Sequence, residues 1–79
     1  MDETDYVLTD LQLALMRVLW ITPEATVSEV HAALHEERGL AITTVATVLK
    51  RLENRGLVRH RSEGRQYVYS AAVTEKDVR

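Results

Sequence analysis

The stretch from Ile42 to Gly56, ITTVATVLKRLENRG, constrains the fold of this chain more than any other part of it. Read as a helix, it places four apolar residues at positions i, i+3, i+4 and i+7, which is the spacing of a face buried against a core. These residues are Val45, Val48, Leu49 and Leu52. The stretch therefore predicts an amphipathic helix that packs along one side and is closed by Gly56.

The opposite face of this predicted helix carries small and basic side chains and no acid, since Glu53 lies nearer its edge. Its members are Thr43, Thr47, Lys50 and Asn54, with Ala46 and Arg51 on its flanks. Threonine can contact base edges or a thymine methyl group, and lysine and arginine can reach guanine or phosphate. The pattern thus suits a helix whose N-terminal half enters a DNA major groove. The alternative is a solvated helix face, and this stretch alone does not separate the two.

Composition excludes several classes of protein. The 79 residues suffice for one small domain, whose stability we expect to be marginal. The chain has no cysteine, and therefore neither a disulfide framework nor a thiolate metal site. It starts with the acidic residues MDETDY where a secretory signal would be basic, and its apolar runs are too short to cross a bilayer. We therefore expect a cytoplasmic protein with no membrane partner.

Charge is distributed very unevenly along the chain. Residues 1–37 hold eight acids and one base, residues 38–70 hold seven bases and two acids, and the last nine residues cancel, which gives the net charge of −2. The distribution predicts a basic surface on an acidic body. Because the local field steers a polyanion more than the total charge does, the negative net charge does not exclude a nucleic-acid partner.

A first helix is predicted near the N-terminus, well before the helix at residues 42–56. Thr9 is its N-cap, Gln12 completes a capping box, and Pro23 ends it. Its apolar stripe consists of Leu11, Leu15, Val18 and Leu19, with Ala14 beside it. Leu13 and Trp20 lie on a second apolar side, which either thickens the core or receives the N-terminal arm.

A second helix begins after Thr26, whose capping box includes Glu29, and ends at Gly39. The residues that we expect to be buried are Val27, Val30 and Leu34, with Ala33 alongside. Only three residues then separate this helix from the helix at residues 42–56. Two helices joined by a short, glycine-containing turn are typical of a helix-turn-helix. The N-cap of the third helix is either Ala41, a poor cap, or Thr43.

Two strands of a hairpin follow, at Leu57–Arg61 and Gln66–Ser70. With Glu63 and Gly64 as the loop, Arg61 pairs with Gln66. In this register Val58, Tyr67 and Tyr69 face the helices, Arg59 and Arg61 point away, and Arg65 lies at the tip. Tyrosines at alternating strand positions are more typical of a core than of a surface that stacks on bases. The predicted fold is mainly α with a small β-hairpin: a winged helix-turn-helix of three helices and a two-stranded wing.

With these elements in order, the chain resembles the DNA-binding domain of the penicillinase-repressor (BlaI/MecI) family of transcriptional regulators. The likeness is carried by LTDLQLALMRVLW (8–20), ATVSEVHAAL (25–34), TTVATVLKRLENRGLV (43–58) and GRQYVYSAAV (64–73). Members are dimeric repressors that bind pseudo-palindromic operators. The resemblance implies that Thr43, Thr44, Ala46 and Thr47 face bases, that Lys50 and Arg51 face bases or phosphate, and that the wing touches the DNA backbone.

The resemblance also implies a division of the chain. Residues 1–73 correspond to the winged-helix DNA-binding domain, and residues 74–79 to the truncated start of a C-terminal dimerisation segment. We therefore expect the full-length form to be a homodimer and this chain to be a monomer. The DNA-binding residues predicted from pattern and resemblance together are Thr43, Thr44, Ala46, Thr47, Lys50, Arg51, Asn54, Arg59, Arg61 and Arg65.

Three other interpretations compete with this one. His31 and His35 have the i, i+4 spacing of metal ligands, but no third ligand lies nearby, so we interpret them as two exposed helix histidines. His60 is expected in the wing rather than in a catalytic role. An enzyme needs converged polar groups that this sequence lacks, so we expect no catalysis, metal or cofactor. The remaining alternative is a winged-helix module whose basic face binds an acidic protein.

Overall fold

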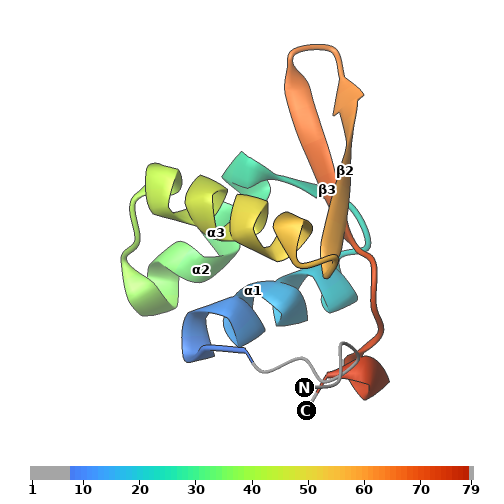
Figure 1. Cartoon of the computed structure of the whole chain (residues 1–79). Coiled ribbons are helices and arrows are strands. Elements are labelled where there is room, and N and C mark those ends of the chain that lie inside the picture. Colours follow the sequence, from blue (N-terminus) through green and yellow to red (C-terminus); the bar gives the residue numbers. More distant parts are fainter. Residues whose placement is uncertain (1–7, 79) are drawn as a thin grey trace.

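The computed structural model describes residues 8–78, with the side chain of Glu37 excepted, and it has the predicted winged-helix architecture (Figure 1). Three helices form the body of the molecule. The elements in chain order are α1 (Asp10–Ile21), β1 (Ala25–Thr26), α2 (Val27–Arg38), α3 (Ile42–Asn54), β2 (Val58–Glu63), β3 (Gln66–Ala71) and the 3₁₀ helix η1 (Glu75–Asp77). The strands form one antiparallel sheet in the order β1-β3-β2, and the β2–β3 hairpin projects from the helical body as a wing.

Local capping determines where the first two helices begin, as predicted. The backbone N–H of Gln12 donates to Thr9 Oγ1 at 3.1 Å, and the N–H of Thr9 donates to Gln12 Oε1 at 3.1 Å. The same reciprocal pair joins Thr26 and Glu29, at 3.2 and 2.8 Å. Each pair satisfies N–H groups that a helix start otherwise leaves without a partner.

The third helix begins differently. Its N-cap is Ala41, which makes no side-chain cap, and Thr43 already lies inside the helix, so the alternative that Thr43 is the cap is wrong. The extended backbone of Ala41 lets its carbonyl accept from Thr44 and Val45, and this starts the helix two residues earlier. At the other end, Gly56 and Leu57 donate back to the carbonyls of Glu53 and Leu52, which closes α3 as predicted.

The apolar stripe of α3 forms the centre of the core. All four predicted residues, Val45, Val48, Leu49 and Leu52, are buried, and they pack with Leu15, Leu19, Val30 and Leu34 of the other helices. The stripes of α1 and α2 were predicted less well. Met16 is fully buried although the pattern did not single it out, and Ala33 is exposed. Leu11, Val18 and Val27 are only partly buried against the core.

The second apolar side of α1 separates into two environments. Trp20 packs against the core, and its Nε1–H donates to the carbonyl oxygen of Val73 at 3.0 Å. Leu13 is half-buried and is not part of the core cluster. Trp20 therefore thickens the core and anchors the segment that follows β3. The alternative role, reception of the N-terminal arm, concerns residues 1–7, which lie outside the described part of the chain.

The predicted register of the hairpin is wrong by two residues. The turn residues are Gly64 and Arg65, so Glu63 pairs with Gln66, Arg61 with Val68 and Val58 with Ala71. Of these two turn residues only Gly64 has a positive φ, 62°, which matches a type II′ turn with glycine at the first central position. A loop of Glu63 and Gly64 would put glutamate at that first central position. The hairpin turns favoured by strand twist require a positive φ there, which glutamate adopts much less readily than glycine.

The slip of two residues preserves the predicted faces but not the predicted burial. Val58 and Tyr69 are buried, whereas Tyr67 is 51% exposed, so its prediction as a core residue is wrong. The strand β1 pairs only with Val68 and Tyr69, which leaves Tyr67 nearer the wing tip. Val68 is buried instead, because in the central strand Thr26 and Arg61 flank it on either side.

The chain after β3 turns back onto α1. Thr74 donates to the carboxylate of Asp77 through its N–H at 2.9 Å and through its hydroxyl at 3.0 Å. These two bonds, the backbone one first, lower the pKa of Asp77. Val73 and Val78 pack against the core. No helix within residues 8–78 is long and apolar enough to cross a membrane.

Candidate nucleic-acid interface

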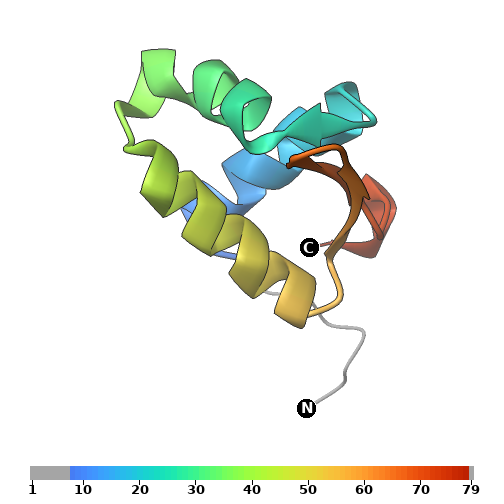
Figure 2. The same cartoon turned by 90° about the horizontal axis from the view of Figure 1, so that it is seen from above.

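Burial of the apolar stripe fixes the rotation of α3 and turns its opposite face to solvent. Figure 2 shows α3 along the outside of the helical body, with no other element covering its outer side. The predicted DNA-binding residues of α3 are all exposed except Ala46, which is half-buried: Thr43, Thr44, Thr47, Lys50, Arg51 and Asn54. The helix thus brings six of them to the surface in one run of three turns.

Thr47 is already oriented by the helix that carries it. Its Oγ1–H donates to the carbonyl oxygen of Thr43 one turn earlier, at 2.9 Å. This bond uses the hydroxyl proton, so the oxygen of the exposed side chain remains free to accept a hydrogen bond. The side chain is therefore prepared to accept a hydrogen bond from an adenine or cytosine amino group, or to contact a thymine methyl group.

The charged residues near the end of α3 divide into two groups. Lys50 and Arg51 make no ion pair with any residue of the described chain and extend into solvent. Arg55, in contrast, donates to Gln12 Oε1 at 3.3 Å and so joins the end of α3 to the start of α1. Glu53 is paired with His60 at 2.6 Å. The outward face of α3 is consequently cationic, and Glu53 at its edge is hydrogen-bonded to His60.

The Glu53–His60 pair also connects the wing with α3. The His60 ring lies 4.3 Å from the ring of Tyr67 and 5.4 Å from that of Tyr69, measured between centroids. Burial raises the pKa of the Tyr69 phenol, and the charges of Glu53 and Tyr67 add to this shift. His60 is therefore a wing residue, as predicted, and it links β2 to the last turn of α3.

The three wing arginines differ in their partners. Arg61 donates to Glu24 Oε1 at 3.0 Å and to Glu63 Oε2 at 2.5 Å. These carboxylates, Glu24 first, raise the pKa of the guanidinium further above its usual range. Arg59 and Arg65 are exposed and make no ion pair within residues 8–78. Arg59 and Arg65 are thus available to an external anion, whereas Arg61 must first exchange a carboxylate.

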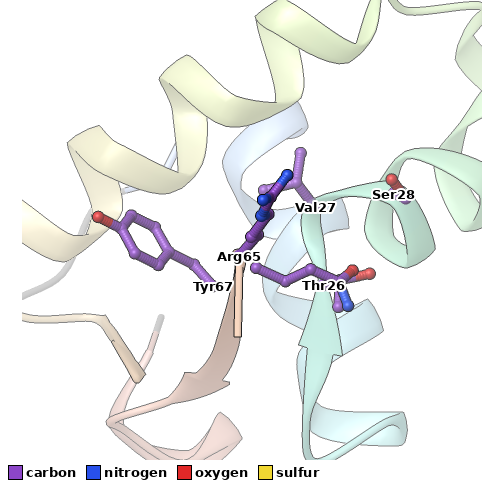
Figure 3. A pocket seen from close by; sticks show the side chains of 6 residues that line it. Thr26, Val27, Ser28, Arg65 and Tyr67 are labelled. Atoms are coloured by element: carbon purple, nitrogen blue, oxygen red, sulfur yellow. The ribbon is translucent and has the colours of Figure 1, made fainter. Parts of the chain in front are cut away.

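A shallow hollow of about 250 Å³ lies between the wing and the start of α2. Its lining residues are Thr26, Val27, Ser28, Arg65, Gln66 and Tyr67. In Figure 3 the side chain of Arg65 lies between the strand and the start of α2, and the ring of Tyr67 points to the opposite side. The hollow is lined by one base and no acid. Sequence reasoning missed it because β3 reaches the start of α2 through its pairing with β1, which joins residues more than 40 positions apart.

The two α2 histidines do not form the pair of exposed side chains that we expected. His35 is exposed, but His31 is half-buried and its Nε2 lies 2.7 Å from the carbonyl oxygen of Leu40. Their ring centroids are 5.2 Å apart. Within residues 8–78 no group of three or more histidine, cysteine or acidic side chains is arranged to hold a metal ion.

Comparison with known proteins agrees with this geometry. The penicillinase repressor family matches residues 8–79. The transcriptional regulator BlaI of Mycobacterium tuberculosis is 45% identical over 64 residues, which cover 80% of this chain and 46% of that protein. The match therefore spans less than half the length of that relative.

Two solved structures share the fold closely. The solution structure of the DNA-binding domain of the repressor BlaI superposes with a TM-score of 0.80 at 31% identity, over 89% of this chain and 85% of that one. The monomeric form of Bacillus licheniformis BlaI, solved in complex with the blaP half-operator, superposes with a TM-score of 0.77 at 30% identity, over 91% and 88%.

Proposed function

We propose that this chain, which belongs to the penicillinase-repressor family, is the operator-binding domain of a transcriptional repressor and acts on double-stranded DNA without catalysis. The observation that carries the proposal is the outward face of α3, where small and basic side chains are exposed over three turns without a free acid. The binding of a half-operator by a similar monomeric domain supports it.

In the proposed complex, α3 lies in the major groove. Thr43, Thr44, Ala46 and Thr47 face base edges, because the N-terminal half of a recognition helix is the part that contacts them. Lys50, Arg51 and Asn54 follow on the same face and contact bases or phosphates. The hydroxyl of Thr47 reads a base amino group as an acceptor, since its proton is held by the carbonyl of Thr43.

The wing contributes contacts that position the domain without reading sequence. Arg59 and Arg65 bind backbone phosphates directly. Arg61 belongs to the same surface, but its contact with phosphate requires release of Glu24 or Glu63. The wing therefore adds affinity through charge, and α3 adds selectivity through bases.

We further propose that the whole repressor is a homodimer that binds a pseudo-palindromic operator, with one winged-helix domain, residues 1–73, on each half-site. The segment from residue 74 onward leads into the part that forms the dimer. This chain alone then acts as a monomer, which should bind one half-site weakly and with strong salt dependence.

The test is selection of duplexes from a random-sequence pool by this chain, followed by a gel-shift titration on a selected duplex and on a shuffled duplex of equal length. Thr47→Ala and Arg51→Ala should each reduce discrimination between the two by about 1–3 kcal/mol. Arg17→Ala, an exposed arginine on α1, is the matched control and should leave discrimination unchanged.

The selection also separates this proposal from its rival. If no sequence is enriched, or if Arg51→Ala lowers the affinity for the selected and the shuffled duplex equally, as Arg17→Ala does, the operator-reading role is refuted. A winged-helix module that binds an acidic protein partner would then become the better interpretation.

A further inference from the structure

We propose that His31 is a positioning residue for operator reading: its ring holds the turn between α2 and α3 and so sets where the first turns of α3 lie. The inference rests on the function proposed above. It concerns a residue of α2 that lies outside the predicted DNA-binding set.

The contact is a hydrogen bond from a side chain of α2 to the backbone of the turn. His31 Nε2 lies 2.7 Å from the carbonyl oxygen of Leu40, nine residues later in the chain. A carbonyl oxygen can only accept, so the ring nitrogen must carry the proton. The Leu40 side chain packs against the core at the same point. The turn is therefore held at Leu40 by both its side chain and its carbonyl.

Apart from His31, no side chain of another element is hydrogen-bonded to the start of α3 among the described residues. Both α1 and α2 begin with a reciprocal capping box, whereas Ala41 gives α3 no side-chain cap. The turn itself is sharp, since Gly39 has a φ of 59°. His31 is hydrogen-bonded to Leu40, the residue just before Ala41. This bond, which we call the tether, thus fixes the start of α3, where the other two helices have a capping box.

Position matters most for the residues that follow the tether. Thr43 and Thr44 lie in the first turn of α3 and Thr47 in the second, three to seven residues beyond Leu40. A hydrogen bond to a base edge requires its partner within about 0.5 Å of the productive geometry. Phosphate contacts through long arginine side chains tolerate larger displacements. Loss of the tether should therefore reduce sequence discrimination more than general affinity for DNA.

Three variants of this 79-residue chain test the inference, each titrated on the selected and shuffled duplexes defined above. His31→Leu fills similar space without a donor, and it should lower discrimination about tenfold while affinity for the shuffled duplex changes less than about twofold. His31→Gln keeps an N–H donor at a similar reach and should restore most of the discrimination. His35→Leu is the matched control, one turn along α2, and should behave like the parent chain.

A spectroscopic measurement accompanies the titrations and detects a variant that fails to fold. Two-bond ¹H–¹⁵N spectra of the parent chain should show the Nε2–H tautomer for His31, and His31→Leu should keep the dispersed amide spectrum of a folded domain with changes centred on Leu40 to Thr44. Discrimination that survives in folded His31→Leu, or is not restored by His31→Gln, overturns the inference alone. An Nδ1–H tautomer in the parent chain also overturns it. A parent chain that selects no sequence overturns the proposed function and this inference together.

Discussion

Leu49 and Lys50 are neighbours in the sequence of α3 and lie on opposite faces of it. Leu49 is fully buried at the centre of the core, and Lys50 is exposed on the proposed DNA-binding face. Replacing each by alanine therefore separates what the helix does for the fold from what it does for binding. Both variants remove side-chain atoms beyond Cβ, and both keep a residue with high helix propensity.

The loss of unfolding free energy expected for Leu49→Ala follows from the complete burial of Leu49. Truncation of a buried leucine costs about 2–5 kcal/mol, from lost transfer free energy and from the cavity left behind. Leu49 belongs to a core cluster that includes residues of all three helices together with Leu57 and Val58, so we expect the cavity to collapse only partly and the cost to be at least about 3 kcal/mol. A domain of 79 residues has an unfolding free energy of about 4–12 kcal/mol. Each kcal/mol lowers its Tm by about 6 °C, so Leu49→Ala should lower the Tm by about 18 °C or more.

Lys50→Ala should behave in the opposite way. An exposed substitution changes stability by less than about 0.5 kcal/mol, which corresponds to a Tm within about 3 °C of the parent chain. Its affinity for the selected duplex should nevertheless fall. Circular-dichroism melts and gel-shift titrations of the two variants measure both effects. A normal Tm for Leu49→Ala, or an early melt for Lys50→Ala, would show that α3 is rotated relative to the core and that the proposed binding face is wrong.

Further predictions concern the wing and its sheet. Arg65→Ala should weaken binding to selected and shuffled duplexes alike and reduce the salt slope by about 1, as for a phosphate contact; a loss confined to the selected duplex would instead make it a base contact. Glu24→Gln should strengthen DNA binding because it removes one of the two negative charges paired with Arg61, and the gain should vanish in the Arg61→Ala background and be absent in Glu75→Gln; a gain that persists without Arg61 would mean a general charge effect. The Tyr69 phenol has a raised pKa when folded, so the unfolded chain loses its proton first as the pH rises past the ordinary value of 10.0. The unfolding free energy should therefore fall above about pH 10, and urea titrations of Tyr69→Phe should show a shallower fall; equal slopes would exclude this group as the cause.

Much of this fold could be predicted from sequence because its signals are local. The capping boxes at Thr9 and Thr26 need partners only three residues away, and both formed as expected. The stripe of α3 repeats with the helical period and is entirely buried. The hairpin register depended on one choice, the turn type at Gly64. The error was an even number of residues, so the alternation of strand faces survived it.

Several other missed features join residues through the packing of separate elements. The partners of Arg61 include Glu24, 37 residues away before β1, and the partner of His31 is a carbonyl in the next turn. Periodicity gives the face on which a residue lies, but it does not give the angle at which two elements cross. The exposure of Tyr67 has the same origin, because it depends on how far β1 extends along β3.

The number of basic side chains that are free of ion pairs limits how tightly a single domain can bind DNA. Four basic side chains on α3 and the wing make no ion pair within residues 8–78: Lys50, Arg51, Arg59 and Arg65. If each neutralises one phosphate, the logarithm of affinity should fall with the logarithm of salt concentration with a slope of about −3.6. Affinity should then drop about 150-fold between 50 and 200 mM salt. A second domain linked in a dimer restores avidity of about 10²–10⁴-fold without any new contact. The single chain should therefore bind its half-site only at low salt, and a covalently linked pair should retain binding at 200 mM on a duplex with two half-sites. A slope near −1 for the single chain would mean that α3 and the wing do not both engage the DNA.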